Sequence, residues 1–420
     1  MVKSRLTFRH PRPGRAALAG LMAGLCAAGA ACSSTDPAPQ TPLTPQLHAR
    51  GDGPPLPDGA QVERPGERPP LSLAPGEIRG TLPPDSRPAK TRIPSIVERG
   101  RLIVGVDQSQ YLLSFRDAKT GELSGFEVAL AHEFARDIFD DPEAVEFRFI
   151  QTSQRREALD SGLVDMVISA SSITEERQRF MAFSAPYLTA HTRLLVLEDS
   201  GIETLGDLGG QTLCVADGST GLQFARAHAD FATLLKVRNW SDCLVALQQN
   251  QTDAILSDDV TLSGMAAQAS FTEIVGPELT EEYYGVAMAL PDDELRAARR
   301  SAASEAAVNK DAPLSADAAD KAGTPEAAPR HGAGEPGPDN APEEDEARGL
   351  VRQVNQTLAR IKRDGTWQIL YDAWFSPYLP AQSPPPVKYA DEAQLVAQRQ
   401  GPAGSQRAAQ PSPGKENSRG

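Results

Sequence analysis

The sequence has little of what nucleic-acid binding, metal binding or catalysis requires. Aromatic residues make up only 5% of its 420 residues, and the formal net charge is −14. Because phosphate binding needs a basic face and single strands need aromatic platforms, we expect no nucleic-acid partner. The cysteines and histidines show no metal-ligand spacing, and no nucleotide-binding loop, cofactor fingerprint or catalytic triad is present. We therefore expect a protein without metal or cofactor that is not an enzyme.

The N-terminus has the pattern of an export signal. Five basic residues precede an apolar run over 16–31 that is short for a membrane span, so 1–31 is predicted to be a signal peptide. The small residues before Cys32, with two serines after it, resemble the bacterial lipoprotein box, although Gly29 stands where leucine is common. This resemblance implies lipidation of Cys32 and anchoring to the outer face of the cell membrane. The alternative is ordinary export with an incidental Cys32.

Proline content and apolar periodicity divide the rest of the chain. Residues 32–93 are proline-rich and almost without periodicity, which predicts a disordered tether after the lipidated cysteine. Strand and helix patterns alternate over 94–188 and again over 189–282, which predicts two α/β units. The segments 283–291 and 350–379 are expected to return to the first unit, the latter as two helices. Residues 292–349 are predicted to be a disordered acidic insertion, and 380–420 a disordered tail.

The stretch 169–187 places a cation where cations are unusual. Thr174 is typical of a helix N-cap, and two glutamates follow it in the first turn. Arg177 comes next, beside the free N–H groups of a helix start. A planar guanidinium there is suited to holding an anion. From this window alone, a solvated surface arginine is an equal alternative.

Five local patterns follow one another along the folded part. They are Gly-Phe-Glu-Val at 125–128, Gly-Leu-Val-Asp at 162–165, Ile-Thr-Glu-Glu-Arg at 173–177 with Phe-Ser-Ala-Pro-Tyr at 183–187, Asp-Ala-Ile-Leu at 253–256, and Asp-Gly-Thr-Trp at 364–367. Together they resemble the extracellular solute-binding proteins of polar amino-acid ABC transporters, in particular glutamate, glutamine and aspartate binders of actinobacterial type. The resemblance covers about 94–291 and 350–378.

The resemblance implies an α/β fold of two lobes, the type II clamp of periplasmic binding proteins. Such a clamp closes on one free amino acid in the cleft between the lobes, at the ends of the strands. Two crossings would join the lobes, near 186–191 and 282–285, and we expect a monomer.

The resemblance also assigns the groups that would bind the α-carboxylate of the ligand. Arg177 would grip it through a bidentate guanidinium contact, assisted by Ser172. Ser219 and Thr220 would complete the capture from the other side of the cleft, at a helix start. A plain turn with an N-cap is the alternative for these two.

Two further positions match those that hold the α-ammonium. The backbone of Ser169 would meet it from one side, and Asp258 would pair with it from the other. A role for Asp258 as an N-cap or in an Asx-turn is the structural alternative, and Asp259 could exchange roles with it.

The ligand's side chain would be read by Thr152, Arg155 and Tyr111. Arg155 matches an arginine that neutralises a second carboxylate, which favours glutamate or aspartate over glutamine or asparagine. The proline and isoleucine of the usual motif are absent, so Arg156 offers a competing register, and a surface charge is the alternative for Arg155. Tyr111 lies near the position of an aromatic residue that covers the ligand's aliphatic part.

Cys26 lies in the predicted signal peptide, and Cys32 is the predicted lipidation site. Two other cysteines remain. Cys214 and Cys243 fall in a strand and a helix that can be neighbours in a compact second unit, and export permits oxidation, so we expect a disulfide, with two buried free thiols as the alternative.

The function implied is delivery of a captured amino acid to the membrane permease of an ABC transporter. A sensor of the same fold that signals to a membrane protein is the second hypothesis, and an exported enzyme on this fold is the third.

Overall fold

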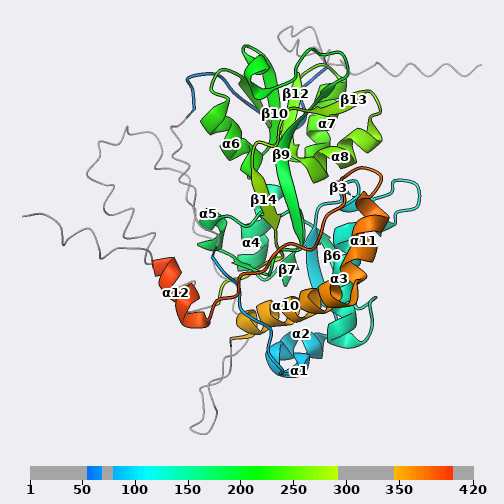
Figure 1. Cartoon of the computed structure of the whole chain (residues 1–420), viewed down its shortest axis with the longest axis vertical. Coiled ribbons are helices and arrows are strands. Elements are labelled where there is room, and N and C mark those ends of the chain that lie inside the picture. Colours follow the sequence, from blue (N-terminus) through cyan, green and yellow to red (C-terminus); the bar gives the residue numbers. More distant parts are fainter. Residues whose placement is uncertain (1–53, 69–78, 292–344, 401–420) are drawn as a thin grey trace, which may run out of the picture. The chain divides into compact units, whose positions relative to one another are not determined.

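The computed structural model describes residues 54–68, 79–291 and 345–400 (Figure 1). The signal peptide, the lipidation site Cys32, and residues 292–344 and 401–420 lie outside the described residues, so the expectations about them stay predictions. Among the described helices, none has the length and apolar character that a membrane crossing requires.

The first lobe is built on a five-stranded sheet. Its strands, in spatial order, are β6 (Val145–Phe149), β2 (Leu102–Val106), β7 (Met166–Val167), β15 (Ala287–Met288) and β8 (Ala182–Phe183). β2 is parallel to β6 and β7, and all its residues are buried, as expected for the central strand of a covered parallel sheet. β15 returns late in the chain and lies antiparallel between β7 and β8, so the first lobe is completed only after the second has been made.

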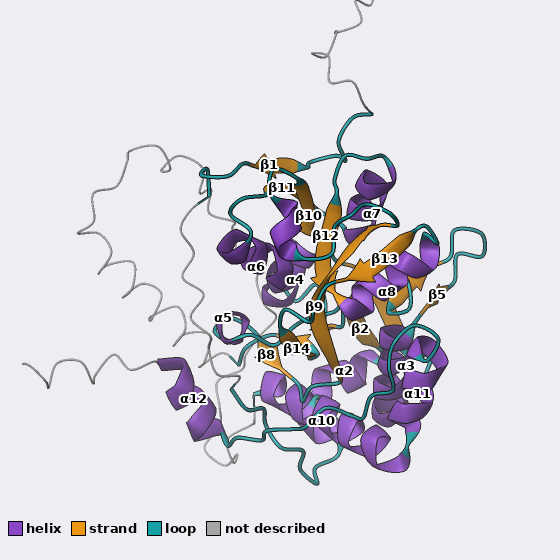
Figure 2. Cartoon of the chain, turned by 45° about the horizontal axis from the view of Figure 1, so that its top comes forward, coloured by secondary structure: helices purple, strands orange, loops and turns teal. Residues whose placement is uncertain are grey.

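Seven helices of the described residues accompany this sheet, and a small sheet lies at its side. The helices are α1 (Ala89–Arg92), α2 (Pro94–Arg99), α3 (Phe126–Phe139), α4 (Arg155–Asp160), α5 (Glu175–Gln178), α10 (Glu346–Asp364) and α11 (Thr366–Phe375). The small sheet contains β3 (Ser109–Gln110), β4 (Ser114–Arg116) and β5 (Leu123–Ser124). α10 and α11 pack against α3 (Figure 2). Val354, Leu358 and Ile361 of α10 are buried, which confirms the predicted apolar face of this helix.

The second lobe is built on a larger sheet. Its strands, in order, are β1 (Gln61–Glu63), β11 (Thr233–Val237), β10 (Thr212–Ala216), β12 (Ala254–Asp258), β9 (Leu188–Leu197) and β13 (Thr272–Val275). Successive residues of these strands enter different cores: Leu195 packs in the cluster with α7 (Trp240–Gln248) and α8 (Asp259–Gln268), and Leu194 packs in the cluster with α6 (Thr220–His228). This alternation covers both faces of the sheet with helices.

Two antiparallel strands join the lobes. β9 is ten residues long, and β14 (Glu281–Tyr284) pairs with its first half, with Tyr284 opposite Leu188 and Glu281 opposite His191. These strands are the two crossings expected near 186–191 and 282–285. The fold is therefore the two-lobe α/β clamp that the sequence predicts.

A disulfide joins Cys214 of β10 to Cys243 of α7, with the Cα atoms 5.6 Å apart. The expected pairing is confirmed. The bond links the strand that leads into the loop 217–219 to a helix whose first residue is Trp240.

The segment before the clamp differs from the disordered tether predicted over 32–93. Residues 61–63 form β1, which adds to the edge of the second-lobe sheet antiparallel to β11. Glu63 forms an ion pair with Arg226 of α6, and Arg68 donates a 2.7 Å hydrogen bond to the carbonyl of Ala229. The segment 61–63 can form an edge strand although prolines lie nearby, because edge strands tolerate proline.

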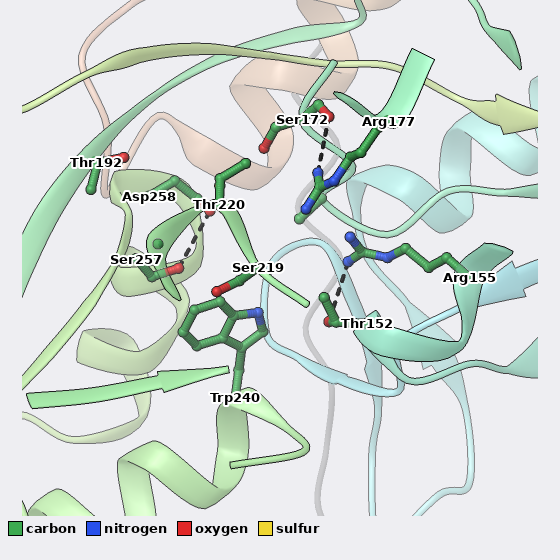
Figure 3. A pocket seen from close by; sticks show the side chains of 12 residues that line it. Thr152, Arg155, Ser172, Arg177, Thr192, Ser219, Thr220, Trp240, Ser257 and Asp258 are labelled. Carbon is green, nitrogen blue, oxygen red and sulfur yellow. Dashed lines mark hydrogen bonds between the residues drawn. The ribbon is translucent and has the colours of Figure 1, made fainter. Parts of the chain in front are cut away.

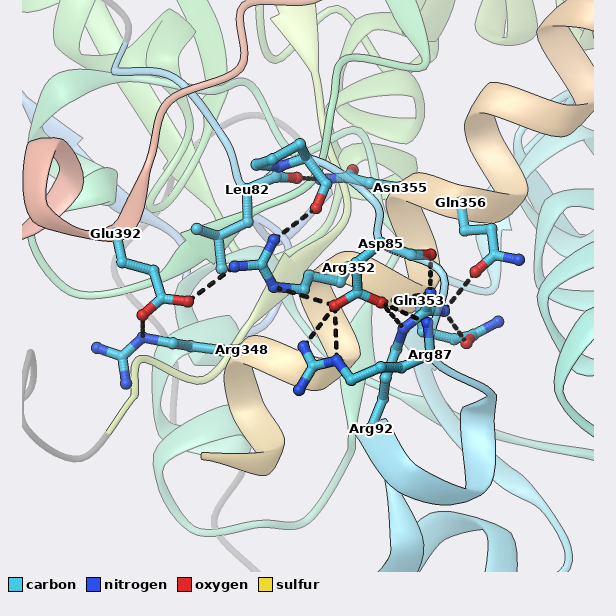
Figure 4. A network of polar contacts seen from close by, with 11 residues as sticks. Leu82, Asp85, Arg87, Arg92, Arg348, Arg352, Gln353, Asn355, Gln356 and Glu392 are labelled. Carbon is cyan, nitrogen blue, oxygen red and sulfur yellow. Dashed lines mark hydrogen bonds and ion pairs between the residues drawn. The ribbon is translucent and has the colours of Figure 1, made fainter. Parts of the chain in front are cut away.

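Residues 79–93 also differ from the prediction, because they dock on the first lobe (Figure 4). Arg92 is 1% exposed and binds the Asp85 carboxylate at 2.7 Å and the Gln353 side chain of α10 at 2.7 Å. Thr81 pairs with Tyr389 in a parallel bridge. Proline content therefore does not signal disorder here, since charged and polar side chains fix this segment to α10.

The tail predicted over 380–420 is likewise structured over its first part. Gln382 binds the backbone of Thr189, and Leu395 of α12 (Glu392–Gln400) is 6% exposed. We call 79–93 the N-terminal flank and 379–396 the C-terminal flank.

Candidate functional site

A small pocket with a volume of about 10 Å³ lies between the lobes (Figure 3). The first lobe supplies Thr152, Arg155, Ala170, Ser172 and Arg177. The second lobe and the crossing strand β9 supply Thr192, Ser219, Thr220, Gly221, Trp240, Ser257 and Asp258. Seven residues named from the sequence thus share one pocket: Thr152, Arg155, Ser172, Arg177, Ser219, Thr220 and Asp258.

Arg177 belongs to the short helix α5 (Glu175–Gln178), whose N-cap is Thr174 as predicted. Its Nη1 donates to the carbonyl of Ser172 at 2.9 Å, and its Nη2 donates to the carbonyl of Gly218 at 3.0 Å. The second bond joins the two lobes directly. Burial lowers the pKa of Arg177, and the nearby Glu282 carboxylate opposes this shift. A guanidinium has five N–H donors, so three remain available to an anion after these two bonds.

Arg155 lies inside the first lobe and reaches the pocket. It is 5% exposed, and its Nη2 donates to the carbonyl of Ser169 and, at 3.3 Å, to the hydroxyl of Thr152. Its buried Nε has no hydrogen-bond partner among the described residues. Arg156 instead lies over the ring of Phe180 with a half-exposed side chain. The surface alternative for Arg155 is therefore wrong, and Arg155 rather than Arg156 faces the pocket.

Two buried carboxyl groups accompany Arg155. Burial raises the pKa of Glu127 to about 7, although the carboxylate accepts hydrogen bonds from Tyr187 and from the amide of Ala170. Burial also raises the pKa of Asp107. Burial lowers the pKa of Arg155 to about 10, and the like charge of Arg177 adds to this effect. Both acids hold protons more tightly than usual, so they offset the charge of Arg155 only in part.

Asp258 ends β12 and begins α8. Its carboxylate accepts a 2.9 Å hydrogen bond from the amide of Thr261, so it is an N-cap and also a pocket residue. Burial raises its pKa to about 6, against the lowering effect of the Tyr284 hydroxyl. Asp259 points elsewhere. Its carboxylate accepts a 3.0 Å hydrogen bond from the backbone amide of His191 and lies 3.2 Å from Nδ1 of the His191 ring. Of the two aspartates, Asp258 is the one that lines the pocket.

The second-lobe hydroxyls are partly engaged with the protein. Ser219 is the N-cap of α6, accepting from Leu222 at 3.0 Å, so the N-cap alternative describes its local role. Thr220 donates to Glu282 at 2.9 Å, and Thr192 donates to the other oxygen of Glu282 at 3.1 Å. Glu282 thereby fixes two pocket hydroxyls from the crossing strand β14.

Two sequence-predicted residues lie beside the pocket rather than in its lining. Ser169 is fully buried, and its carbonyl accepts from Arg155; Ala170, with the left-handed φ of 43°, lines the pocket in its place. Tyr111 packs edge-on against Phe115, and its carbonyl lies against Gly264 of α8, where a Cβ would come within 2.3 Å. Its loop therefore contacts the second lobe without reaching the pocket, and Trp240 supplies the aromatic wall.

Sequence reasoning missed Thr192, Trp240 and Ser257. Trp240 is the first residue of α7 and is 5% exposed, and no local pattern in the sequence distinguishes it from a core residue. Thr192 lies on β9 directly opposite Asp258 of β12, and Ser257 precedes Asp258 on β12. Such neighbours become visible only once the strand order is known.

The arrangement brings cations, hydroxyls and one carboxylate to a closed, concave surface at strand and helix ends. Residues 102–377 match a known family, described as bacterial extracellular solute-binding proteins, family 3. The chain belongs to this family.

Individual proteins and a solved structure are also similar to this chain. The glutamine-binding protein of Geobacillus stearothermophilus is 34% identical over 195 residues, covering 46% of this chain and 74% of its own. The glutamate-binding protein GluB of Corynebacterium efficiens is 33% identical over 210 residues, covering 47% and 71%. The crystal structure of a mutant of ArgBP from T. maritima matches with a TM-score of 0.51 at 24% identity, covering 68% of this chain and 99% of that one.

Proposed function

We propose that this protein binds a free acidic amino acid, glutamate or aspartate, and delivers it to the permease of an ABC transporter. In this proposal Cys32 carries the lipid that anchors the protein to the outer face of the cell membrane. The observation that carries the ligand assignment is the convergence of two guanidinium groups, Arg155 and Arg177, on a pocket whose lining contains one carboxylate, Asp258.

The charges favour an acidic ligand over its amide. Two arginines and one aspartate leave a net charge of one positive unit on the lining, which an acidic amino acid, with net charge −1, neutralises. Arg177 would hold the α-carboxylate with Ser172, Ser219 and Thr220, and Asp258 would hold the ammonium. Arg155 and Thr152 would then face the second carboxylate. Glutamine or asparagine would leave the charge of Arg155 offset only in part, by Glu127 and Asp107.

The lining supports capture rather than chemistry. Among the twelve pocket residues there is no histidine, cysteine or second carboxylate that could act as a paired acid and base. The named relatives bind glutamine or glutamate, which agrees with an amino-acid ligand.

Calorimetric titration of the chain with all twenty amino acids tests the proposal. We expect one glutamate or aspartate per chain, bound more tightly than glutamine or asparagine. Arg177→Ala should abolish binding of every amino acid, whereas Arg179→Ala, on the exposed side of the same region, should bind normally. Binding of no amino acid, or retained affinity in Arg177→Ala, would contradict the proposal.

A sensor of the same fold is the second candidate. One contact favours it: Gln178, next to Arg177, binds both the amide and the carbonyl of Arg79 in the N-terminal flank, at 2.9 and 3.0 Å. The segment that carries Arg177 therefore contacts the N-terminal flank, which lies outside the family match over 102–377. Loss of labelled glutamate uptake on removal of the protein would support delivery, and unchanged uptake would support sensing.

A further inference from the structure

A second cavity lies on the first lobe, behind the loop that carries Arg177. It has a volume of about 220 Å³ and is lined by both flanks, by residues of the loop 172–178, and by Pro186 and Tyr283 at the two crossings. This volume is below the roughly 300–1,000 Å³ of typical small-molecule sites, which limits the occupant to a small molecule. Most of its walls lie at residues that the family match does not reach or that face away from the amino-acid pocket.

The wall of this cavity is mostly apolar, with two cations and the polar residues Thr81, Gln178 and Ser184. Ile173, Pro186, Tyr283, Pro386 and Val387 supply the apolar surface, and Arg79 and Lys388 supply positive charge. Among the residues that the structure describes, none of the lining is a carboxylate. This combination suits a molecule with an apolar body and an anionic end.

Arg79 is a buried cation of this wall that is compensated only in part. Its side chain is 8% exposed, and burial lowers its pKa. Its nearest acid is Glu175, with 3.5 Å between Nη2 and Oε1, and Glu175 is 35% exposed. Its buried Nη1 has no hydrogen-bond partner among the described residues. A guanidinium so placed gains from an additional anion in the same wall.

We propose that this cavity is a second ligand site, which takes a small amphipathic monocarboxylate. The apolar body lies between Ile173, Tyr283 and Val387, and the carboxylate lies at the end lined by Arg79. No bond is made or broken in this binding.

The loop 172–178 connects this site to the amino-acid pocket. Ser172 and Arg177 line the pocket, whereas Ile173 and Gln178, the residues directly after them, line the cavity. Adjacent residues of one loop therefore face two sites. The amide of Ile173 also donates to the carbonyl of Tyr283 at 2.8 Å, on the crossing strand β14. Filling the cavity orders the loop in the arrangement in which Arg177 meets Gly218, which favours amino-acid binding. This coupling rests on the proposed function, but the site itself does not.

Octanoate, below its micellar concentration, is the probe, with 1-octanol as the uncharged control. Calorimetry on the full chain should give one octanoate per chain and at least tenfold weaker binding of 1-octanol. Arg79→Gln should weaken octanoate binding at least tenfold, and Val387→Trp, which fills the cavity, should abolish it. Arg116→Gln, an exposed arginine on β4, is the matched control and should bind octanoate normally.

Glutamate titration of each variant keeps the test decisive, because glutamate binding by Arg79→Gln and Val387→Trp shows that they are folded. Equal affinity for 1-octanol, no octanoate binding, or normal binding by both variants would overturn the site. At saturating octanoate we expect at least threefold tighter glutamate binding, and unchanged affinity would overturn the coupling. Octanoate binding by a chain that binds no amino acid would refute the proposed function and leave the second site standing.

Discussion

Arg155 and Arg156 are adjacent in the sequence and lie in opposite environments. Arg155 is 5% exposed, near Glu127 and Asp107, whereas Arg156 lies over Phe180 at the surface with Asp160 at 3.4 Å. A one-residue step on a helix turns the side chain by about 100°, which explains why adjacent residues can face core and solvent. This pair therefore offers a matched comparison of a pocket charge and a surface charge.

Arg155→Met should remove the preference for an acidic ligand. The affinity for glutamate should fall by about 10- to 100-fold, the effect of losing a charge-assisted contact of about 1.5–3 kcal/mol, and the affinity for glutamine should change little. Arg156→Met is the control and should leave both affinities unchanged. Competition calorimetry with the two ligands measures the difference, and an intact acidic preference in Arg155→Met would refute its role.

Asp258 should make amino-acid binding depend on pH. Its pKa is raised to about 6, and only the ionised carboxylate attracts the ligand's ammonium, so affinity should fall as pH drops through 6. Between pH 7 and pH 5 the expected loss is about tenfold, since one pH unit below the pKa leaves about a tenth of the groups ionised.

Two variants separate Asp258 from other titrating groups. Asp258→Asn should bind weakly with a flat profile over this range. Glu127→Gln should keep the fall, although the pKa of Glu127 is about 7. A flat profile in the unsubstituted chain would contradict the assignment of Asp258.

The residues found from the sequence are those that belong to contiguous motifs. Arg177 follows its N-cap by three positions, and Asp258 follows a buried strand, so local chemistry marks both. Trp240 and Thr192 cannot be assigned to the pocket without the strand order of the second lobe. Glu282 cannot be assigned to it without the position of the second crossing. Tyr111 fails for the opposite reason: its loop is local, but its orientation depends on packing against Gly264 of α8.

At the scale of elements, the disulfide between β10 and α7 should stabilise the second lobe. It closes a loop of 29 residues, for which chain entropy predicts about 3–4 kcal/mol in the free energy of unfolding. The double variant Cys214→Ala/Cys243→Ala should lose about that amount in urea unfolding. Reductant should destabilise the unsubstituted chain and leave the double variant unaffected. Equal stability of the two proteins without reductant would show that the bond contributes nothing.

The flanks show where sequence composition misleads. Both were predicted to be disordered from their proline content, and the predicted helices α10 and α11 between them are present. Apolar periodicity detects a helix that buries one face. It does not detect an extended segment held by Arg92 or Gln382, because their partners Gln353 and Thr189 lie 261 and 193 residues away and leave no local pattern.

Asp85→Ala should destabilise the first lobe through Arg92. Arg92 is 1% exposed and would lose its carboxylate partner inside the protein. We expect a loss of about 2–3 kcal/mol in urea unfolding, below the value for fully buried pairs because the side chain of Asp85 is 26% exposed. Asp58→Ala removes the fully exposed partner of Arg238 and should leave stability unchanged, so equal stability of the two variants would refute the role of this network.

At the scale of the whole molecule, the C-terminal flank holds the hinge of the clamp. Gln382 accepts from the amide of Thr189 at 3.1 Å and donates to its carbonyl at 3.0 Å, as a neighbouring strand residue would. The same flank is fixed to the first lobe, where Lys362 donates to the carbonyl of Pro385 at 3.0 Å. A crossing strand that pairs with a docked segment is stiffer than one that pairs with β14 alone, so this flank favours the arrangement in which Arg177 reaches Gly218.

Gln382→Ala should therefore loosen the clamp without unfolding it. The radius of gyration of the ligand-free chain, measured by small-angle scattering, should rise, and that of the glutamate-bound chain should stay the same. Affinity should fall by about three- to tenfold, because the closed arrangement becomes a smaller fraction of the population. Gln368→Ala, which removes an exposed glutamine that binds Asp372 on α11, is the control. If both variants match the unsubstituted chain in size and affinity, β9 and β14 alone set the hinge, and the C-terminal flank serves only the stability of the first lobe.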